Sequence, residues 1–112
     1  MNEYDVVLFN DEDLSLEVNI DKGQDTVWLS LDQISDLFER DKSVISRHIK
    51  KIYKSDELSD SSTVAYFATV QKEGNRDIER QIAYYNLDMI ISIGYRVKSK
   101  RGITFRKWQV IY

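Results

Sequence analysis

The sequence contains no cysteine and only one histidine in its 112 residues. The absence of cysteine excludes disulfides, thiol nucleophiles and zinc sites built from thiolates. His48 has no second histidine or cysteine to complete a familiar metal site or catalytic triad, so a place on a helix surface or at an interface is the better interpretation. Glycine-rich phosphate loops and nucleophile motifs are also missing. We therefore expect a protein that is not an enzyme and that carries no cofactor.

Long apolar runs are absent too, since no stretch approaches the roughly 20 apolar residues of a membrane span. The N-terminus, MNEYDVV, is acidic and lacks the basic and apolar regions of a secretory signal. We expect a single cytoplasmic domain over residues 1–112 with no membrane contact. The last predicted helix extends to Tyr112, and no glycine follows to end it. This suggests that the chain is the N-terminal fragment of a longer protein.

The charges of the chain are segregated along the sequence. The net charge of −3 argues against nucleic-acid binding if it is taken alone. Residues 1–41 hold 12 acids and 2 bases, but residues 42–54 hold 5 bases and no acid. Residues 86–112 hold 6 bases and one acid. Two basic blocks of this kind can create a local positive surface on a protein that is acidic overall.

The first third of the chain predicts a small antiparallel β-meander. Residues 4–9, 14–20 and 26–29 are rich in β-branched and aromatic side chains, and the second run alternates apolar with polar residues. The acidic stretch 10–13 between the first two strands has hairpin-loop chemistry. A calcium loop is the alternative for this stretch, but its sixth and twelfth positions are Leu16 and Lys22 instead of glycine and glutamate.

Residues 30–53 predict two short amphipathic helices joined by a tight polar corner. Ser30 and Gln33 form a capping box for the first helix, and Asp41 can cap the second. Both helices carry an apolar stripe at helical spacing. The stripes consist of Ile34, Leu37 and Phe38 in the first helix and of Ile45, Ile49 and Ile52 in the second.

This pair of helices has the layout of a helix-turn-helix, in which the second helix enters a DNA groove. Ser35 supplies the small residue needed where the two helices cross. The turn position that usually holds glycine is Glu39, and the apolar position after it is Arg40. Because of these departures, a purely structural helix pair with a solvated basic face stays open as the alternative.

On the DNA-binding interpretation, the outer face of the second helix contacts the duplex. Arg47 is the best candidate for reading a guanine, because its planar fork matches the O6/N7 edge of that base. The lysines suit phosphates, and the two serines are small enough to let the helix lie deep. The candidate residues of this helix are Lys42, Ser43, Ser46, Arg47, Lys50 and Lys51.

A β-hairpin is expected after the helix pair, where it could act as a wing. Residues 63–70 and 78–85 are strand-prone, and residues 72–76 between them form the expected loop. The loop region mixes basic with acidic residues. Contact with the DNA backbone and simple solubility of the tip both remain open.

Two helices are expected to close the chain, one capped by Asn86 and one starting at Gly102. A basic connector over residues 96–101 separates them, and Lys98, Lys100 and Arg101 in it could clamp phosphates. Aromatic residues between these bases could instead form a platform for single strands, but their helical spacing favours core packing. The expected inward residues are Leu87, Ile90, Ile91 and Tyr95 in the first helix and Phe105, Trp108 and Ile111 in the second.

Two segments carry a resemblance to a known family. WLSLDQISDLFERDKSVISRHIKKIY and IAYYNLDMIISIGYRVKSKRGITFRKW resemble the N-terminal region of the RhuM virulence-protein family, from about residue 28 to residue 108. The block YNLDMIISIGYRVKSKRGITFRKW is highly characteristic, and its closing TFRKW also resembles the Bro-N type of phage and viral DNA-binding domain. The resemblance implies a bacterial, cytoplasmic protein, usually longer than this chain, and it implies a DNA-binding module more firmly than a biological role.

Together these patterns predict an α+β winged helix-turn-helix, opened by the antiparallel β-meander and closed by the C-terminal helices. The expected function is sequence-selective binding of double-stranded DNA in transcriptional or mobile-element regulation. Two copies on a palindromic site would be usual for such a helix pair, although the sequence does not demand a homodimer. It shows no sign of a small-molecule ligand. The main alternative is a protein-interaction module whose basic helix docks an acidic partner, and an enzyme would need catalytic residues beyond Tyr112.

Overall fold

The computed structural model describes residues 4–111, apart from the side chains at positions 4, 61, 69, 71 and 109–111. This part of the chain forms an α+β fold around a five-stranded antiparallel sheet in the order β1-β2-β3-β5-β4. None of the helices described has the length and hydropathy needed to span a membrane. The elements in chain order are β1 (Tyr4–Asp11), β2 (Leu14–Asp21), β3 (Thr26–Ser30), α1 (Leu31–Phe38), α2 (Lys42–Lys54), α3 (Asp60–Thr63), β4 (Val64–Glu73), β5 (Arg76–Asn86), α4 (Leu87–Val97) and α5 (Lys100–Ile111).

The predicted N-terminal meander is confirmed. β1 and β2 pair antiparallel across a two-residue turn, with Asp11 opposite Leu14, and β3 pairs with β2. The alternation of the second strand buries Leu16 and Val18, which join Phe9 of β1 in the core. At the other end of β2, the carboxylate of buried Asp21 accepts hydrogen bonds from the backbone N–H of Gln24 and the indole N–H of Trp28, each at 3.2 Å, and so fixes the turn into β3.

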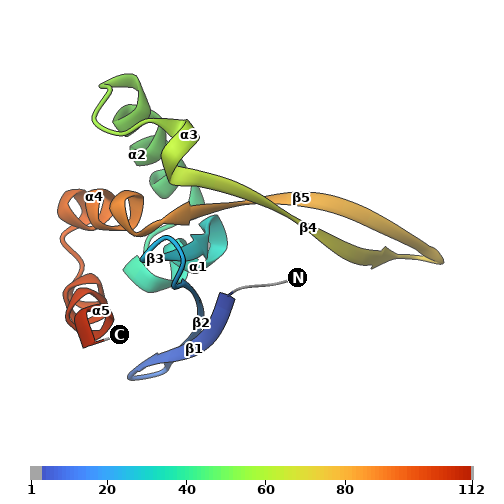
Figure 1. The fold of residues 1–112 in the computed structure, drawn as a ribbon, viewed down its shortest axis with the longest axis horizontal. Helices are drawn as coiled ribbons and strands as arrows, with labels where there is room; N and C mark the ends of the chain where they lie inside the picture. Colours follow the sequence, from blue (N-terminus) through green and yellow to red (C-terminus); the bar gives the residue numbers. More distant parts are fainter. Residues whose placement is uncertain (1–3, 112) are drawn as a thin grey trace.

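The predicted hairpin is also present, but its strands are longer and its loop is shorter than expected. Residues 72 and 73 continue the ladder, with Lys72 opposite Asp77 and Glu73 opposite Arg76. The loop contains only Gly74 and Asn75, and Gly74 has a φ of 67°, a conformation that glycine adopts without strain. β5 pairs with β3 only through Tyr84, Tyr85 and Asn86, so the rest of the hairpin projects from the sheet as a two-stranded ribbon (Figure 1).

The predicted helix caps are confirmed. Ser30 and Gln33 form the capping box at α1, with hydrogen bonds of 2.9 and 3.2 Å between side chain and backbone. The Asp41 carboxylate accepts from the backbone N–H of Ser43 at 2.9 Å, and the Asn86 side chain accepts from that of Met89 at 3.2 Å. These bonds satisfy backbone donors that a helix N-terminus otherwise leaves free.

The C-terminal region differs from the prediction in two respects. The basic connector over residues 96–101 is wrong, because α4 runs to Val97 and α5 starts at Lys100, which leaves a link of two residues. Tyr95 does not face inward, since it is 60% exposed. Phe105 is buried as expected and Trp108 packs against the core, whereas the side chain of Ile111 lies outside the described residues. The buried residues of α4 are Met89, Ile90, Ile93 and Val97.

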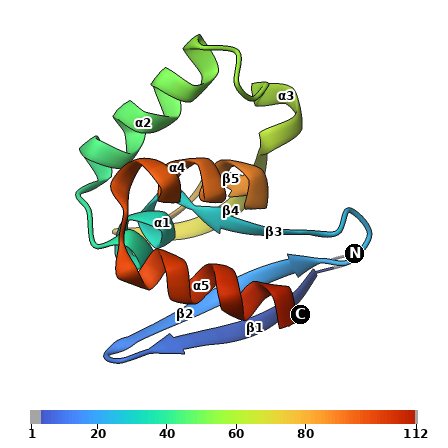
Figure 2. The ribbon, with the colours of Figure 1, turned by 90° about the vertical axis from the view of Figure 1, so that its left-hand side faces the viewer.

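The helices are arranged in two layers. α1, α4 and α5 contact strands of the sheet, and α2 packs on α1 and α4 as an outer element (Figure 2). α5 is anchored to β1 by an aromatic cluster, in which the Phe9 ring lies 5.2 Å from Phe105 and 5.3 Å from Trp108 in edge-to-face contacts. Because α2 lies outermost, its face opposite the core is free to meet a partner.

The turn between α1 and α2 contains a strained residue. Glu39, which stands at the usual glycine position, has φ 56° and ψ 45° in the left-handed region, where a side chain costs energy. Its carboxylate is only loosely paired, 4.0 Å from Arg101. We expect Glu39→Gly to raise the free energy of unfolding by about 0.5–1 kcal/mol, measured by urea denaturation.

Glu39→Ala is the matched control for this prediction. Alanine removes the same carboxylate but keeps the Cβ in the left-handed conformation, so it should bring no gain in stability. A glycine variant no more stable than the alanine variant would show that the backbone at this turn is not strained.

Candidate nucleic-acid interface

The candidate interface is the exposed face of α2. Ile45, Ile49 and Ile52 are buried on the side that meets α1 and α4. On a helix the residues between these positions point the other way. The exposed side therefore collects polar and basic residues, which are Lys42, Ser43, Arg47, Lys50, Lys51 and Lys54, with Ser46 half-buried at its border.

The N-terminal end of α2 is already engaged in local contacts. The Ser43 hydroxyl donates to the Asp41 carboxylate at 2.6 Å, and the Lys42 ammonium lies 3.0 Å from Asp32. The bonds from Ser43 lower the pKa of Asp41, and the contact with Asp32 raises the pKa of Lys42. The Lys42–Asp32 pair is exposed and exchangeable, since both side chains are more than half exposed.

The middle of α2 carries cations without acidic partners. Within the described part of the chain, Arg47, Lys50 and Lys51 form no ion pair. Their field is felt by His48, whose pKa is lowered first by burial and then by the charges of Lys51, Arg96 and Arg47. The exposed face of α2 is therefore a positive surface on an acidic chain.

The turn before α2 brings the end of α4 to this surface. Arg40 donates to the Val97 carbonyl at 2.9 Å and to the Phe38 carbonyl at 3.1 Å, so one guanidinium joins the C-termini of α4 and α1. Ser35 stabilises the same turn by donating its hydroxyl to the Arg40 carbonyl. Lys98 directly follows Val97, so it stands next to the contact between the α1–α2 turn and α4.

The predicted phosphate clamp is divided by the fold. Lys98 and Lys100 are exposed, but the Arg101 side chain is only 10% exposed. Its guanidinium lies 3.4 Å from Asp11 and 3.2 Å from Asp13, so it ties α5 to the β1–β2 turn. Arg101 is thus occupied by the protein's own carboxylates and is not available to a phosphate.

Two basic residues near α2 were missed by the reasoning from sequence. Arg40 counted only as a departure from the helix-turn-helix pattern, yet it joins two helix ends. Arg96, assigned to a connector, lies on α4 close enough to lower the pKa of His48, and it pairs with Glu57 at 2.7 Å. No sequence signal pointed to either role, because both depend on how α4 packs beside α2.

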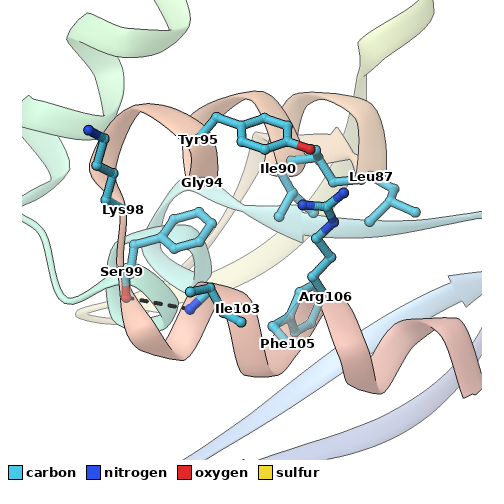
Figure 3. Close-up of a pocket in the computed structure, with 12 residues that line it drawn as sticks. Leu87, Ile90, Gly94, Tyr95, Lys98, Ser99, Ile103, Phe105 and Arg106 are labelled. Carbon is cyan, nitrogen blue, oxygen red and sulfur yellow. Dashed lines mark hydrogen bonds between the residues drawn. The ribbon is translucent and has the colours of Figure 1, made fainter.

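A second feature of the surface is an apolar pocket between α4 and α5, of about 370 Å³. Tyr95 and Ile103, both more than half exposed, lie on its two sides, and Phe38 also lines it. Arg106 reaches from α5 toward the Tyr95 ring, with its guanidinium carbon 5.1 Å from the ring centroid (Figure 3). The residues of α4 predicted to face inward, Leu87, Ile90, Ile91 and Tyr95, all line this pocket.

Comparison with known proteins gives a family match in the C-terminal part of the chain. No curated protein and no solved structure gives a significant match. Residues 62–111 match the model of the virulence protein RhuM family. This match contains β4, β5, α4 and α5, and therefore both walls of the apolar pocket, whereas α1 and α2 precede it. Over residues 62–111, which are less than half of the chain, the sequence is therefore similar to that of the virulence protein RhuM family.

Proposed function

We propose that this protein binds double-stranded DNA through the exposed face of α2, as a winged helix-turn-helix. The observation that carries the proposal is the row of unpaired cations on α2, opposite a buried isoleucine stripe. Arg47 would read a base edge, and Lys50 and Lys51 would contact phosphates, with Lys42 and Lys98 at the end of the helix. Ser43 and Ser46 would let the helix approach closely.

The surroundings of α2 support this arrangement. The strand before the helix pair, β3, is hydrogen-bonded to β5, the second strand of the hairpin that follows it. The hairpin and the helix pair therefore rest on a common frame, as a wing and a recognition helix would. Asp41 caps the N-terminus of α2, and the hydrogen bond from Arg40 to Val97 holds the start of α2 against α4. A reading helix needs this rigidity, because base contacts depend on its placement.

Selection of bound duplexes from a random pool tests the proposal directly. We expect wild-type protein to enrich a shared motif and the triple variant Arg47→Ala, Lys50→Ala, Lys51→Ala to enrich none. All three positions are exposed, so the variant should keep its fold. Failure of the wild type to retain any duplex at low salt would refute DNA binding.

Binding should also depend on pH through His48. Its pKa is lowered in the free protein, by burial and by the cations Lys51, Arg96 and Arg47. Nearby phosphates would raise this pKa, so the complex would take up a proton and affinity would increase as the pH falls from about 7.5 to about 6. The gain for one proton is at most about tenfold per pH unit. Titrations of wild type and His48→Gln at several pH values check this, and equal pH dependence of the two would contradict it.

The pocket between α4 and α5 favours one alternative, a protein-interaction module. Its apolar walls and the basic residues Lys98 and Arg106 among its lining could hold an apolar side chain of an acidic partner. Ile103→Asp places a charge in the pocket and leaves α2 unchanged. If that variant lost the protein's activity in vivo while retaining duplex binding, the pocket would carry the main function.

The proposed biological role rests on DNA binding together with the similarity to the RhuM family. We propose transcriptional or mobile-element regulation in the bacterial cytoplasm, because a sequence-selective DNA-binding module of the RhuM family would act there. Genome-wide mapping of the bound protein tests this role, and binding sites away from promoters and mobile elements would contradict it.

A further inference from the structure

We propose that two copies of this chain associate through the free edge of β4, pairing antiparallel about a two-fold axis beside Ala68. The joined hairpins would form a four-stranded ribbon between the two domains. Only β4 and β5 take part in this interface, so the inference does not depend on DNA binding.

The first observation is the isolation of the hairpin. Only Tyr84–Asn86 of β5 pair with the rest of the sheet, and Arg76–Ala83 pair with β4 alone. Figure 1 shows the ribbon extending away from all the helices. Two-stranded ribbons have little stability of their own in water, and additional strands stabilise them. A partner strand would therefore support the exposed part of this hairpin.

The second observation is the character of the β4 edge. Among the strands described, β4 is hydrogen-bonded only to β5. The N–H of its first residue, Val64, donates to the Asp60 carbonyl, and beyond Val64 the outer N–H and C=O groups of the strand are available for pairing. Natural edge strands are usually protected by lysine, proline or a bulge. β4 has no proline, and its only charged residues, Lys72 and Glu73, stand at its far end. This edge is open to strand addition.

The third observation is that β4 complements itself. In antiparallel pairing, opposite residues lie on the same face of the sheet. A two-fold axis beside Ala68 places Tyr66 of each copy opposite Val70 of the other. These side chains are 65% and 67% exposed in the single chain, and they form a favourable aromatic and β-branched pair. Lys72 falls opposite Val64, so no like charges face each other.

The absence of cysteine makes this register measurable by cross-linking. Opposite residues of an antiparallel pair lie about 4.5–5.5 Å apart between Cα atoms, within the range of a disulfide. We expect Ala68→Cys to form a covalent dimer under mild oxidation of the native protein. Gln81→Cys is the matched control, because Gln81 is the β5 neighbour of Ala68 and lies one strand farther from the edge. It should remain a monomer on a non-reducing gel.

Sedimentation equilibrium provides the second arm of the test. Wild-type protein should sediment as a dimer, and Tyr66→Lys as a monomer with an unchanged circular dichroism spectrum, because lysine protects an edge without disturbing β5. A monomeric wild type at all concentrations would overturn the proposal. Equal cross-linking of Gln81→Cys and Ala68→Cys, or a dimer in which Ala68→Cys does not cross-link, would overturn this interface.

Discussion

Gly102→Ala is expected to lower the free energy of unfolding by about 1–3 kcal/mol, a large effect for the addition of one methyl group. A Cβ at this position would lie 2.5 and 2.9 Å from two carbons of the Phe38 ring. Phe38 is 2% exposed and cannot move aside without disturbing the core it joins. Thermal unfolding should show the loss as roughly 4 °C for each kcal/mol.

Gly94→Ala is the matched control, because Gly94 approaches the same ring from α4. Its Cβ would lie 3.3 Å from Phe38, a contact that a small shift relieves. Alanine in a helix interior also gains up to about 1 kcal/mol over glycine, so the net change should be near zero. Phe38→Leu should reduce the cost of Gly102→Ala in the double variant. If Gly102→Ala were neutral, α5 would not pack on Phe38 as closely as the structure shows.

Arg47→Ala is expected to weaken binding to the selected DNA site by about 1–3 kcal/mol, or roughly 5- to 150-fold, and to relax base preference at one position. The reason is the loss of a bidentate donor that a lysine or alanine cannot replace. Arg47 is exposed and unpaired in the described structure, so the change should leave stability within about 0.5 kcal/mol. Fluorescence anisotropy with matched and mismatched duplexes measures both effects.

Lys50→Ala and Lys72→Ala separate reading of the sequence from attraction to phosphates. Lys50→Ala should lower affinity equally for all sequences, because a phosphate contact carries no base information. Lys72 stands near the tip of the hairpin, far along the ribbon from α2, and its removal should have little effect. Equal loss of affinity for all sequences on Arg47→Ala would assign that residue to the backbone instead of a base.

The parts of the fold that the sequence predicts are those decided by neighbouring residues. Ser30 with Gln33, Asp41 and Asn86 cap their helices as expected, because a cap needs only a side chain and the next three residues. The meander follows from alternation within single strands. The candidate face of α2 could also be predicted, since three isoleucines at helical spacing fix which side is buried.

The orientation of α4 could not be predicted in the same way. Apolar residues lie around most of the circumference of α4. Their periodicity therefore does not decide whether the side with Tyr95 or the side with Val97 is buried. Packing on β3 and β5 buries the side with Val97, and the side with Tyr95 lines the pocket between α4 and α5. The start of α5 was predicted at Gly102, whereas the helix begins two residues earlier at Lys100, and within it Gly102 makes room for Phe38.

The structural role of Arg101 could not be predicted from the sequence for a different reason. Its carboxylate partners, Asp11 and Asp13, are about 90 positions away in the sequence, and nothing local distinguishes it from Lys98 and Lys100. Only the packing of α5 beside β1 brings these charges together. Long-range ion pairs of this kind can turn a predicted binding residue into a structural one.

The salt dependence of duplex binding measures how many phosphates the protein contacts. If Lys42, Lys50, Lys51, Lys98 and Lys100 each neutralise one phosphate, log K should fall linearly with log salt concentration with a slope of about −4.5. The triple alanine variant of α2 removes two of these five lysines and should therefore show a slope of about −2.7. Absence of binding at low salt, or an affinity that does not change with salt, would contradict the account of α2 as a DNA-binding helix.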